Sequence, residues 1–501
     1  MDMDTVSTIE SLPDELLAAI LKIVADSPIP MIRRIPPCSI TLSTVSRRFR
    51  YLALASPELW TTIRLSHRSR SWKWAALFVE RSRSRLLDIS INLEAYTITN
   101  KARRYGYDSP IRIEKALSVV GPHIHRWRTL AVRLGWMDQL DELVSYMLQS
   151  SFPATSRLES VHVSVIDEYH DFDVSQSLVE ALAGSCLRAL RINTRSGIPN
   201  MSGLPTLQSL DIVHSPHHSK ALHAILGASS PLKNLVIRGF LASHSYPFAE
   251  SFDACNITTL AIRITESIST DHSGWNTTSD LQFRLFSRAF SLPNLEHLEL
   301  IHAFAGSAAE SHIIIRVPAD WEPALFPTLR TLRLVDLRFS PKNLAFIQSF
   351  SQGITTLELI HTSANKHLLT PLRSDGGWPA LSSLAVEGNG SSTWLVPFLT
   401  ARSRLRGLST LTVSPPLASI VRPIASASKI KLRILADGQS PSLTDSPYPS
   451  FYYDDDYLDI QDFEYTEVPV EPPTITMAPP TIFGGNSRMM RRRRRFGLRR
   501  I

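Results

Sequence analysis

Cysteine is scarce in this chain of 501 residues, which contains only Cys38, Cys186 and Cys255. This odd count, with no metal-type spacing, excludes a disulfide framework and a cysteine zinc site and favours a reducing compartment. Long hydrophobic runs are also missing, because the longest one near the acidic N-terminus has about ten residues, too few for a membrane helix. We therefore expect neither a signal peptide nor a membrane span.

The usual signatures of catalysis are absent as well. The sequence has no Gly-rich phosphate loop, no paired zinc ligands and no nucleophile elbow. His214, His217 and His218 cluster in a Ser/Pro-rich stretch, but no cysteine or carboxylate stands at a spacing that would complete a metal site. The sequence therefore favours exposed loop histidines, and it predicts a protein that is not an enzyme and holds no cofactor or metal.

The composition is that of a globular protein, with 43% hydrophobic and 20% charged residues. The net charge of +7 has a local origin, because eight arginines fall between Arg488 and Arg500. Without them the chain is close to neutral, so the basic character belongs to this terminal segment and not to the fold.

An amphipathic helix is predicted directly after Ser11. Ser11 can cap free backbone N–H groups, Pro13 is tolerated in a first turn, and Asp14 suits the positive end of a helix. Apolar residues then recur at helical spacing until Asp26, where an Asp-Ser-Pro sequence ends the pattern.

A second helical pattern carries Leu42, Val45, Phe49 and Leu52 on one side, and a Pro-Glu-Leu-Trp turn ending at Trp60 follows it. Two short helices cannot bury this many apolar residues against each other. The surplus indicates a docking face.

The segments Leu-Pro-x-Glu-Leu-Leu, Val-Ser-Arg-Arg-Phe-Arg and Ser-Pro-Glu-Leu-Trp resemble an F-box, the module that binds the adaptor subunit of SCF-type ubiquitin ligases. Two features depart from the family pattern: Phe49 stands where tryptophan is common, and a proline-rich insertion from Ser27 to Cys38 lengthens the spacing. The alternative is an ordinary helical hairpin that caps a larger domain. The residues that match the adaptor-binding positions are Leu12, Pro13, Leu16, Leu17, Ile20, Val45, Arg48, Phe49 and Trp60.

After a predicted helix at residues 71–81, the pattern apolar-x-x-apolar-x-apolar occurs twelve times. The copies recur about every 29 residues, near the upper end of the range for leucine-rich repeats. Four copies follow a Leu-Pro-x-Leu-like lead-in, and helix-like stretches at residues 178–183, 220–226, 283–290 and 395–401 lie between copies. The copies begin at Leu86, Trp127, Leu158, Leu187, Leu207, Leu232, Ile257, Leu295, Leu329, Ile354, Leu381 and Leu408.

A strand and a helix of this length cannot bury their own apolar faces, so each unit needs a neighbour stacked on it. Leu298, Leu332 and Leu357 are expected at one inward position of successive repeats, with Glu296 and Glu358 exposed. The intervals are irregular and the asparagine ladder is missing. The pattern therefore resembles a degenerate leucine-rich-repeat solenoid, with an unrelated α/β domain as the alternative.

The predicted fold class is thus α/β: a helical F-box, an irregular leucine-rich-repeat-like solenoid of parallel strands plus helices, and a disordered tail. The boundaries are residues 1–10 for a disordered N-terminus, 11–65 for the F-box-like module, 66–437 for the solenoid and 438–501 for the tail. The tail is predicted to be disordered because it has too little regular apolar content to fold alone.

As a whole the chain resembles fungal F-box proteins with a C-terminal repeat domain. The resemblance implies a non-catalytic substrate adaptor that binds the SCF adaptor subunit, and through it a cullin ligase, and holds an unknown protein substrate on the solenoid. A protein-interaction scaffold that recruits no ligase is the alternative. Arg491, Arg492, Arg493, Arg494 and Arg495 form a candidate nuclear import signal, so we expect the protein in the nucleus, the cytoplasm or both. Nucleic-acid binding by this segment is disfavoured because Phe496 is its only aromatic residue.

Overall fold

The computed structural model describes residues 9–26, 38–66, 69–93, 113–150, 157–165, 174–193, 201–213, 231–238, 252–265, 280–281, 290–303, 314–315, 326–335, 347–348, 350–360, 378–387, 395–400 and 407–435. The chain divides into two compact units, Met1–Ser450 and Phe451–Ile501. All described residues belong to the first unit. The predicted tail at 438–501 lies outside the described residues.

The N-terminal region is helical. It begins with the 3-10 turn η1 (Ile9–Ser11), in which the N–H of Leu12 donates to the carbonyl of Ile9 over 3.4 Å. Ile9 and Glu10, which were predicted to be disordered, therefore belong to the turn that leads into α1. The helices that follow are α1 (Asp14–Asp26), α2 (Cys38–Val45), α3 (Arg47–Ala55) and the 3-10 helix η2 (Pro57–Trp60).

Ser46 divides the predicted second helical pattern into two helices. Its backbone is extended, with φ −149° and ψ 170°, and its hydroxyl accepts a hydrogen bond from the N–H of Phe49. Serine competes with the helix for backbone hydrogen bonds, which is why it favours caps over helix interiors. The apolar periodicity therefore continues across a real break in the helix.

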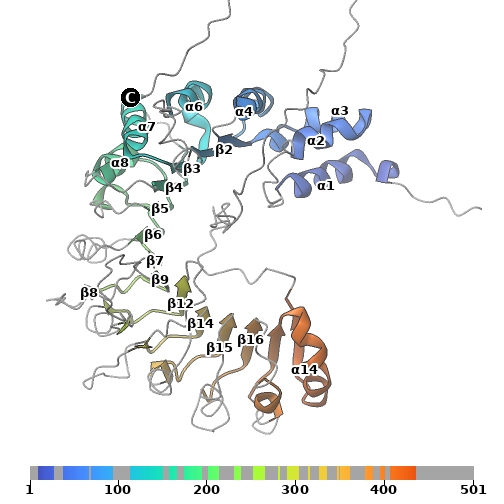
Figure 1. Cartoon of the computed structure of the whole chain (residues 1–501), viewed down its shortest axis with the longest axis vertical. Coiled ribbons are helices and arrows are strands. Elements are labelled where there is room, and N and C mark those ends of the chain that lie inside the picture. Colours follow the sequence, from blue (N-terminus) through green and yellow to red (C-terminus); the bar gives the residue numbers. More distant parts are fainter. Residues whose placement is uncertain are drawn as a thin grey trace, which may run out of the picture. The chain divides into compact units, whose positions relative to one another are not determined.

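Fourteen described strands form one parallel sheet, and each of them pairs with the strand of this sheet that follows it in the sequence (Figure 1). Twelve of them coincide with the twelve predicted copies of the repeat. The strands are β1 (Thr62–Ser66), β2 (Leu87–Asn92), β3 (Trp127–Leu134), β4 (Ser160–Val165), β5 (Ala189–Asn193), β6 (Ser209–Val213), β7 (Asn234–Arg238), β9 (Thr259–Thr265), β12 (His297–Ala303), β14 (Thr331–Val335), β15 (Thr356–Ile360), β16 (Ser383–Glu387), β17 (Thr410–Val413) and β18 (Lys431–Ile434).

Helices lie between several of these strands, as the predicted strand–helix repeat requires. Figure 1 shows α4, α6, α7 and α8 along the first strands of the sheet and α14 beside its last strands. The predicted helices at 71–81 and 178–183 are confirmed by α4 and α8, residues 395–400 are helical, and residues 220–226 and most of 283–290 lie outside the described residues. The helices are α4 (Ser69–Arg81), α6 (Ile113–Val120), η4 (Gly121–Arg126), α7 (Met137–Gln149), α8 (Val174–Leu182), η6 (Met201–Gly203) and α14 (Pro415–Ala427), and short strands pair as β8 (Phe252–Asp253) with β11 (Phe290–Ser291) and β10 (Asp280–Leu281) with β13 (Ile314–Ile315).

The register of the sheet stacks equivalent leucines into a continuous apolar layer. Leu298 pairs with Leu332, and Leu332 pairs with Leu357. All three are 0% exposed, so the predicted inward position is confirmed. Because side chains alternate along a strand, the polar residues between them point to the opposite face of the sheet.

The Leu-Pro-x-Leu lead-in forms a tight turn before the strand. The N–H of the fourth residue donates to the carbonyl of the first over 3.2 Å at Leu207, Leu295, Leu329 and Leu381. Proline suits the second position of such a turn because its φ is already fixed. The turn brings two apolar side chains of each lead-in into the core.

The sheet begins earlier in the sequence than predicted. β1 pairs in register with β2, so the predicted boundary at residue 65 falls inside the first strand. Trp60, Ile63 and Leu65 fit the apolar-x-x-apolar-x-apolar pattern as a thirteenth copy, which the F-box assignment concealed.

Candidate functional site

The N-terminal helices share one buried core. Leu17 and Leu21 of α1 are 0% and 1% exposed, and Phe49 and Leu52 of α3 are 6% exposed each. The predicted adaptor-binding residues therefore differ in burial. Leu17, Phe49 and Trp60 are interior, whereas Leu16, the sequence neighbour of Leu17, is exposed. The interior residues can affect a partner only by holding the helices in place.

Arg48 fixes the start of α1. Its Nε donates to Oδ1 of Asp14 over 2.8 Å, and its Nη2 donates to the carbonyl of Leu12 over 2.6 Å. These bonds hold the Leu12-Pro13 turn against α3, with Pro13 exposed and Leu12 partly buried. Arg48 therefore has a structural role in this region whatever else it contacts.

A second apolar face runs along α1 beside the buried one. Leu16 is 55% exposed, Ile20 is 36% exposed and Ile23 is 71% exposed. Their spacing of four and three residues places them on one side of the helix. Val24, 37% exposed, extends this face toward the core side. We call Leu16, Ile20, Ile23 and Val24 the α1 stripe, and it is the largest grouping of exposed apolar side chains on a single described helix.

Two further apolar side chains are exposed on α3, where sequence reasoning did not place them. Tyr51 is 67% exposed and Leu54 is 40% exposed. At 100° per residue they lie on the side of α3 away from Phe49 and Leu52. Val45, a predicted site residue at the end of α2, is 61% exposed. The helical spacing shows that Tyr51 and Leu54 lie on a different side of α3 from Phe49 and Leu52. It does not show which of the two sides is buried.

Trp60 joins the helical module to the sheet. It is 0% exposed, its indole N–H donates to the carbonyl of Ala53 over 2.7 Å, and its ring meets Phe78 edge to face at 5.0 Å. The guanidinium of Arg81 lies 4.4 Å from its ring centroid. Trp127, which stands at the same position two strands later in the sheet, makes the same hydrogen bond, since its indole donates to the carbonyl of Val120, also seven residues earlier. Trp60 thus occupies the corner position of the first repeat.

Ion pairs connect strands on the polar face of the sheet. Asp211 of β6 accepts two hydrogen bonds of 2.6 Å from Arg238 of β7, and Nε of Arg191 lies 3.3 Å from the same carboxylate. The Asp211 and Arg238 side chains are only 11% and 8% exposed. These charges are therefore desolvated, and removing the Asp211 carboxylate would leave the buried charge of Arg238 unpaired and destabilise the fold.

A second cluster lies further along the same face. Arg333 of β14 contacts Glu299 of β12 over 3.1 Å and Glu358 of β15 over 3.0 Å. Glu358 was predicted to be exposed, but its side chain is 25% exposed and is held by the buried Arg333. Glu296, at 57% side-chain exposure, follows the prediction. The sequence marks these residues as polar positions but does not show the pairing across repeats.

His162 of β4 lies next to Arg191 in the register of the sheet. Burial, and then the charges of Arg191, Arg238 and Arg133, lower the pKa of His162 to about 2. Its imidazole is therefore neutral in the folded protein at any physiological pH. A neutral histidine among arginines cannot act as a cationic contact.

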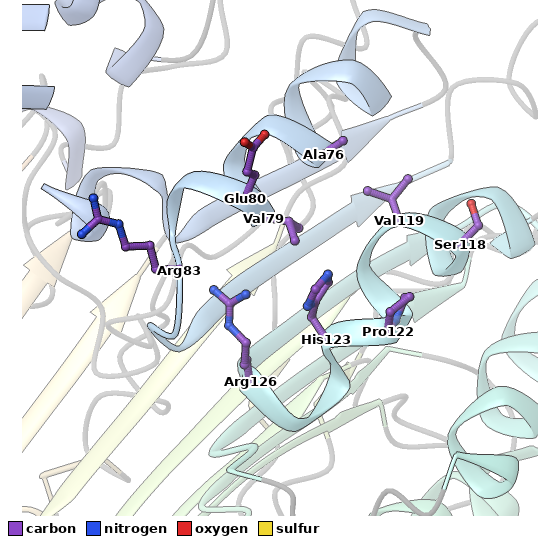
Figure 2. A pocket seen from close by; sticks show the side chains of 9 residues that line it. All are labelled: Ala76, Val79, Glu80, Arg83, Ser118, Val119, Pro122, His123 and Arg126. Atoms are coloured by element: carbon purple, nitrogen blue, oxygen red, sulfur yellow. The ribbon is translucent and has the colours of Figure 1, made fainter. Parts of the chain in front are cut away.

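An open pocket of about 640 Å³ lies between α4 and the α6–η4 segment (Figure 2). Figure 2 shows the guanidinium of Arg126 beside the ring of His123, with Arg83 set apart. Arg126 donates to the carbonyl of Arg85 over 2.9 Å and to Oγ of Ser82 over 2.6 Å. Burial, then Arg126 and His125, lower the pKa of His123, which favours its neutral form. The residues that line the pocket are Ala76, Val79, Glu80, Arg83, Ser118, Val119, Pro122, His123 and Arg126.

Several residues that the sequence singled out lie outside the described residues. These are the insertion at residues 27–37, His214, His217 and His218, and the arginines at 491–495. Within the described ranges, no group of three or more His, Cys, Asp or Glu is arranged to hold a metal ion. No helix in the described part of the chain is both long and apolar enough to cross a membrane.

Comparison with known proteins finds no family model that matches the chain and no match among curated proteins.

Proposed function

We propose that the protein is the substrate-recognition adaptor of an SCF-type ubiquitin ligase. In this function the N-terminal helices bind the ligase adaptor subunit, and through it a cullin, while the repeat sheet holds a protein substrate. The protein itself transfers no ubiquitin and acts without a cofactor.

The observation that carries the proposal is the α1 stripe. The helix α1 carries the buried Leu17 and Leu21, yet it also carries three residues that are 36% to 71% exposed, namely Leu16, Ile20 and Ile23. Contiguous exposed apolar residues on a helix are typical of a surface that a partner covers. The stripe lies in the segment whose sequence resembles the F-box, and this resemblance is why the adaptor subunit of SCF-type ligases is proposed as the partner.

The repeat sheet supports the second half of the proposal. Its polar face carries charged and hydroxyl side chains on many strands; Arg64 of β1 and Arg433 of β18 are exposed, whereas Glu299 is buried. Stacked repeats present such positions as one extended surface, which suits contact with another protein. The substrate is proposed as a protein for this reason.

The test measures co-purification of the full chain with the purified ligase adaptor. The Leu16→Ala, Ile20→Ala double variant should lose binding, because truncating central apolar anchors costs about 2 kcal/mol or more each. The matched control is the Glu15→Ala, Lys22→Ala double variant, which changes two exposed side chains on the other side of α1. Equal melting temperatures of the variants would show that folding is unaffected.

Undiminished binding by the apolar double variant would refute the proposed docking surface. If the unmodified chain itself does not bind the adaptor, the alternative of an interaction scaffold that recruits no ligase is correct. Because the control variant retains the α1 stripe, loss of binding there would also speak against an apolar interface.

We further propose that the arginines at 491–495 serve nuclear import. A dense cationic cluster of this length is typical of such signals. Deleting residues 488–501 should move a fluorescent fusion from the nucleus to the cytoplasm while adaptor binding persists. An unchanged distribution would show that the segment is not the signal.

A further inference from the structure

The sheet ends on an open strand edge. β18 is the last strand in the order, and no described strand pairs with its outer side. The N–H of Lys431 donates to the carbonyl of Ser409, and that of Leu435 donates to the carbonyl of Val413, both over 2.9 Å. Because successive residues of a strand turn their backbone groups to opposite sides, Leu432 and Ile434 present their N–H and C=O groups outward. Such a row is a template for a further strand.

The apolar layer is only partly covered at the same place, although α14 packs against β18. Leu432 and Ile434 stand in register with Leu411 and Val413, which are both 0% exposed. Ile434 is nevertheless 49% exposed. At the opposite end of the sheet the equivalent residue Leu65 is only 1% exposed, and α4 packs against β1 there. Among the described residues, the repeat layer is therefore better covered at its start than at its end.

The opposite face of this edge is positively charged. Lys431 and Arg433 are exposed on β18, and Lys429 is exposed in the turn before it. Between Pro415 and Leu435 the chain contains no acidic residue, and Arg422 of α14 adds a further positive charge. The edge thus combines backbone groups that pair with no described strand, an apolar side and a cationic side.

We propose that β18 accepts a fifteenth strand from a partner protein, an extended segment in which acidic and apolar residues alternate. Side chains alternate in direction along a strand, so one set would meet Lys431 and Arg433 while the other covers Leu432 and Ile434. Backbone hydrogen bonds would supply affinity, and the alternation would supply specificity. This binding surface is independent of the proposed ligase function.

Charge argues against a second copy of the chain as the partner. Two β18 edges paired antiparallel about Arg433 would place the two copies of Arg433 directly opposite each other, and centring the pair on Leu432 would oppose Arg433 to Lys431. Like charges directly opposite each other destabilise strand pairing. An acidic strand replaces this repulsion by attraction.

The experiment is fluorescence anisotropy of the full chain with a labelled peptide of sequence Glu-Val-Glu-Tyr-Glu-Val-Glu. Binding should weaken at least tenfold in the Arg433→Glu variant. It should remain in Arg330→Glu, which makes the same charge change at an exposed residue before β14. Both sites are at the surface, so both variants should fold. A peptide of the same composition with its four glutamates placed together should bind at least tenfold more weakly, and binding should protect the amide protons of Leu432 and Ile434 from exchange.

Four results with the full chain and one with a shortened chain would overturn the proposal. They are absence of binding, equal binding by the Arg433→Glu and Arg330→Glu variants, equal binding of the rearranged peptide, and dimers of the chain that the alternating peptide dissociates. Binding that develops only after residues 436–501 are deleted would also overturn it, because a segment of the chain itself would then be the occupant.

Discussion

The cost of breaking an ion pair in the repeat sheet should depend on burial and not on geometry. The chain offers a matched comparison, because Arg238 binds Asp211 through two hydrogen bonds of 2.6 Å and Arg128 binds Asp88 through two of 3.0 and 2.5 Å. The first pair has side chains 8% and 11% exposed, and the second has side chains 43% and 18% exposed. The perturbation is Asp to Asn in each pair, which keeps the shape and removes the charge.

Asp211→Asn leaves the Arg238 guanidinium, and that of Arg191 beside it, buried without their shared carboxylate. Removing one partner of a buried pair costs about 3–5 kcal/mol, since the remaining charge keeps its desolvation penalty. Asp88→Asn leaves Arg128 in contact with water, so the cost is about 1 kcal/mol or less. Since the denaturant slope is the same for both variants, the buried change should lower the urea unfolding midpoint at least about threefold more than the exposed change.

The assay is urea unfolding of the full chain, followed by circular dichroism at neutral pH. A third variant, Asp211→Leu with Arg238→Leu, should lose less stability than Asp211→Asn, because no charge of the pair stays buried. Equal midpoint shifts for Asp211→Asn and Asp88→Asn would refute the reasoning, and so would a double leucine variant that is less stable than Asp211→Asn.

Three further outcomes are expected. Leu17→Ala should destabilise the protein by about 2–5 kcal/mol because Leu17 is 0% exposed, whereas Leu16→Ala should cost under about 1 kcal/mol because Leu16 is 55% exposed. Thermal melting of both variants measures the difference, and equal losses of stability would contradict it. Leu357→Ala should cost about 2–5 kcal/mol and Glu296→Ala under about 0.5 kcal/mol in chemical unfolding, and a reversed order would show that the register is wrong. The pKa of His162 is lowered on folding, so protons bind the unfolded state more strongly below about pH 6.5 and stability falls as the pH decreases. Between pH 7 and pH 5 this loss of folding stability amounts to about 2 kcal/mol. The His162→Gln variant should not show the loss in unfolding measurements at the two pH values. If the variant's stability depends on pH as that of the unmodified chain does, the prediction is wrong.

Local patterns in the sequence determined the repeated elements. The end of α1 at Asp26, α4, and the twelve strands that match the apolar-x-x-apolar-x-apolar motif follow from periodicity and turn chemistry, because strand alternation and helix capping depend on residues close together in the chain. β1 carried the same motif and could also have been found.

Contacts between segments that are distant in the sequence could not be predicted from it, and only the tertiary structure shows them. Leu16 and Leu17 both fit the apolar period of α1, and only the position of α2 and α3 makes one exposed and the other buried. The pairing of Asp211 with Arg238, 27 residues apart, depends on the register of β6 and β7, which irregular repeat intervals do not fix. The open edge at β18 likewise depends on the absence of a described neighbour beyond the last strand, whereas the sequence shows only Lys431-Leu432-Arg433-Ile434 as one more alternating segment. Periodicity determines which residues share a face, and packing between elements determines whether that face is covered.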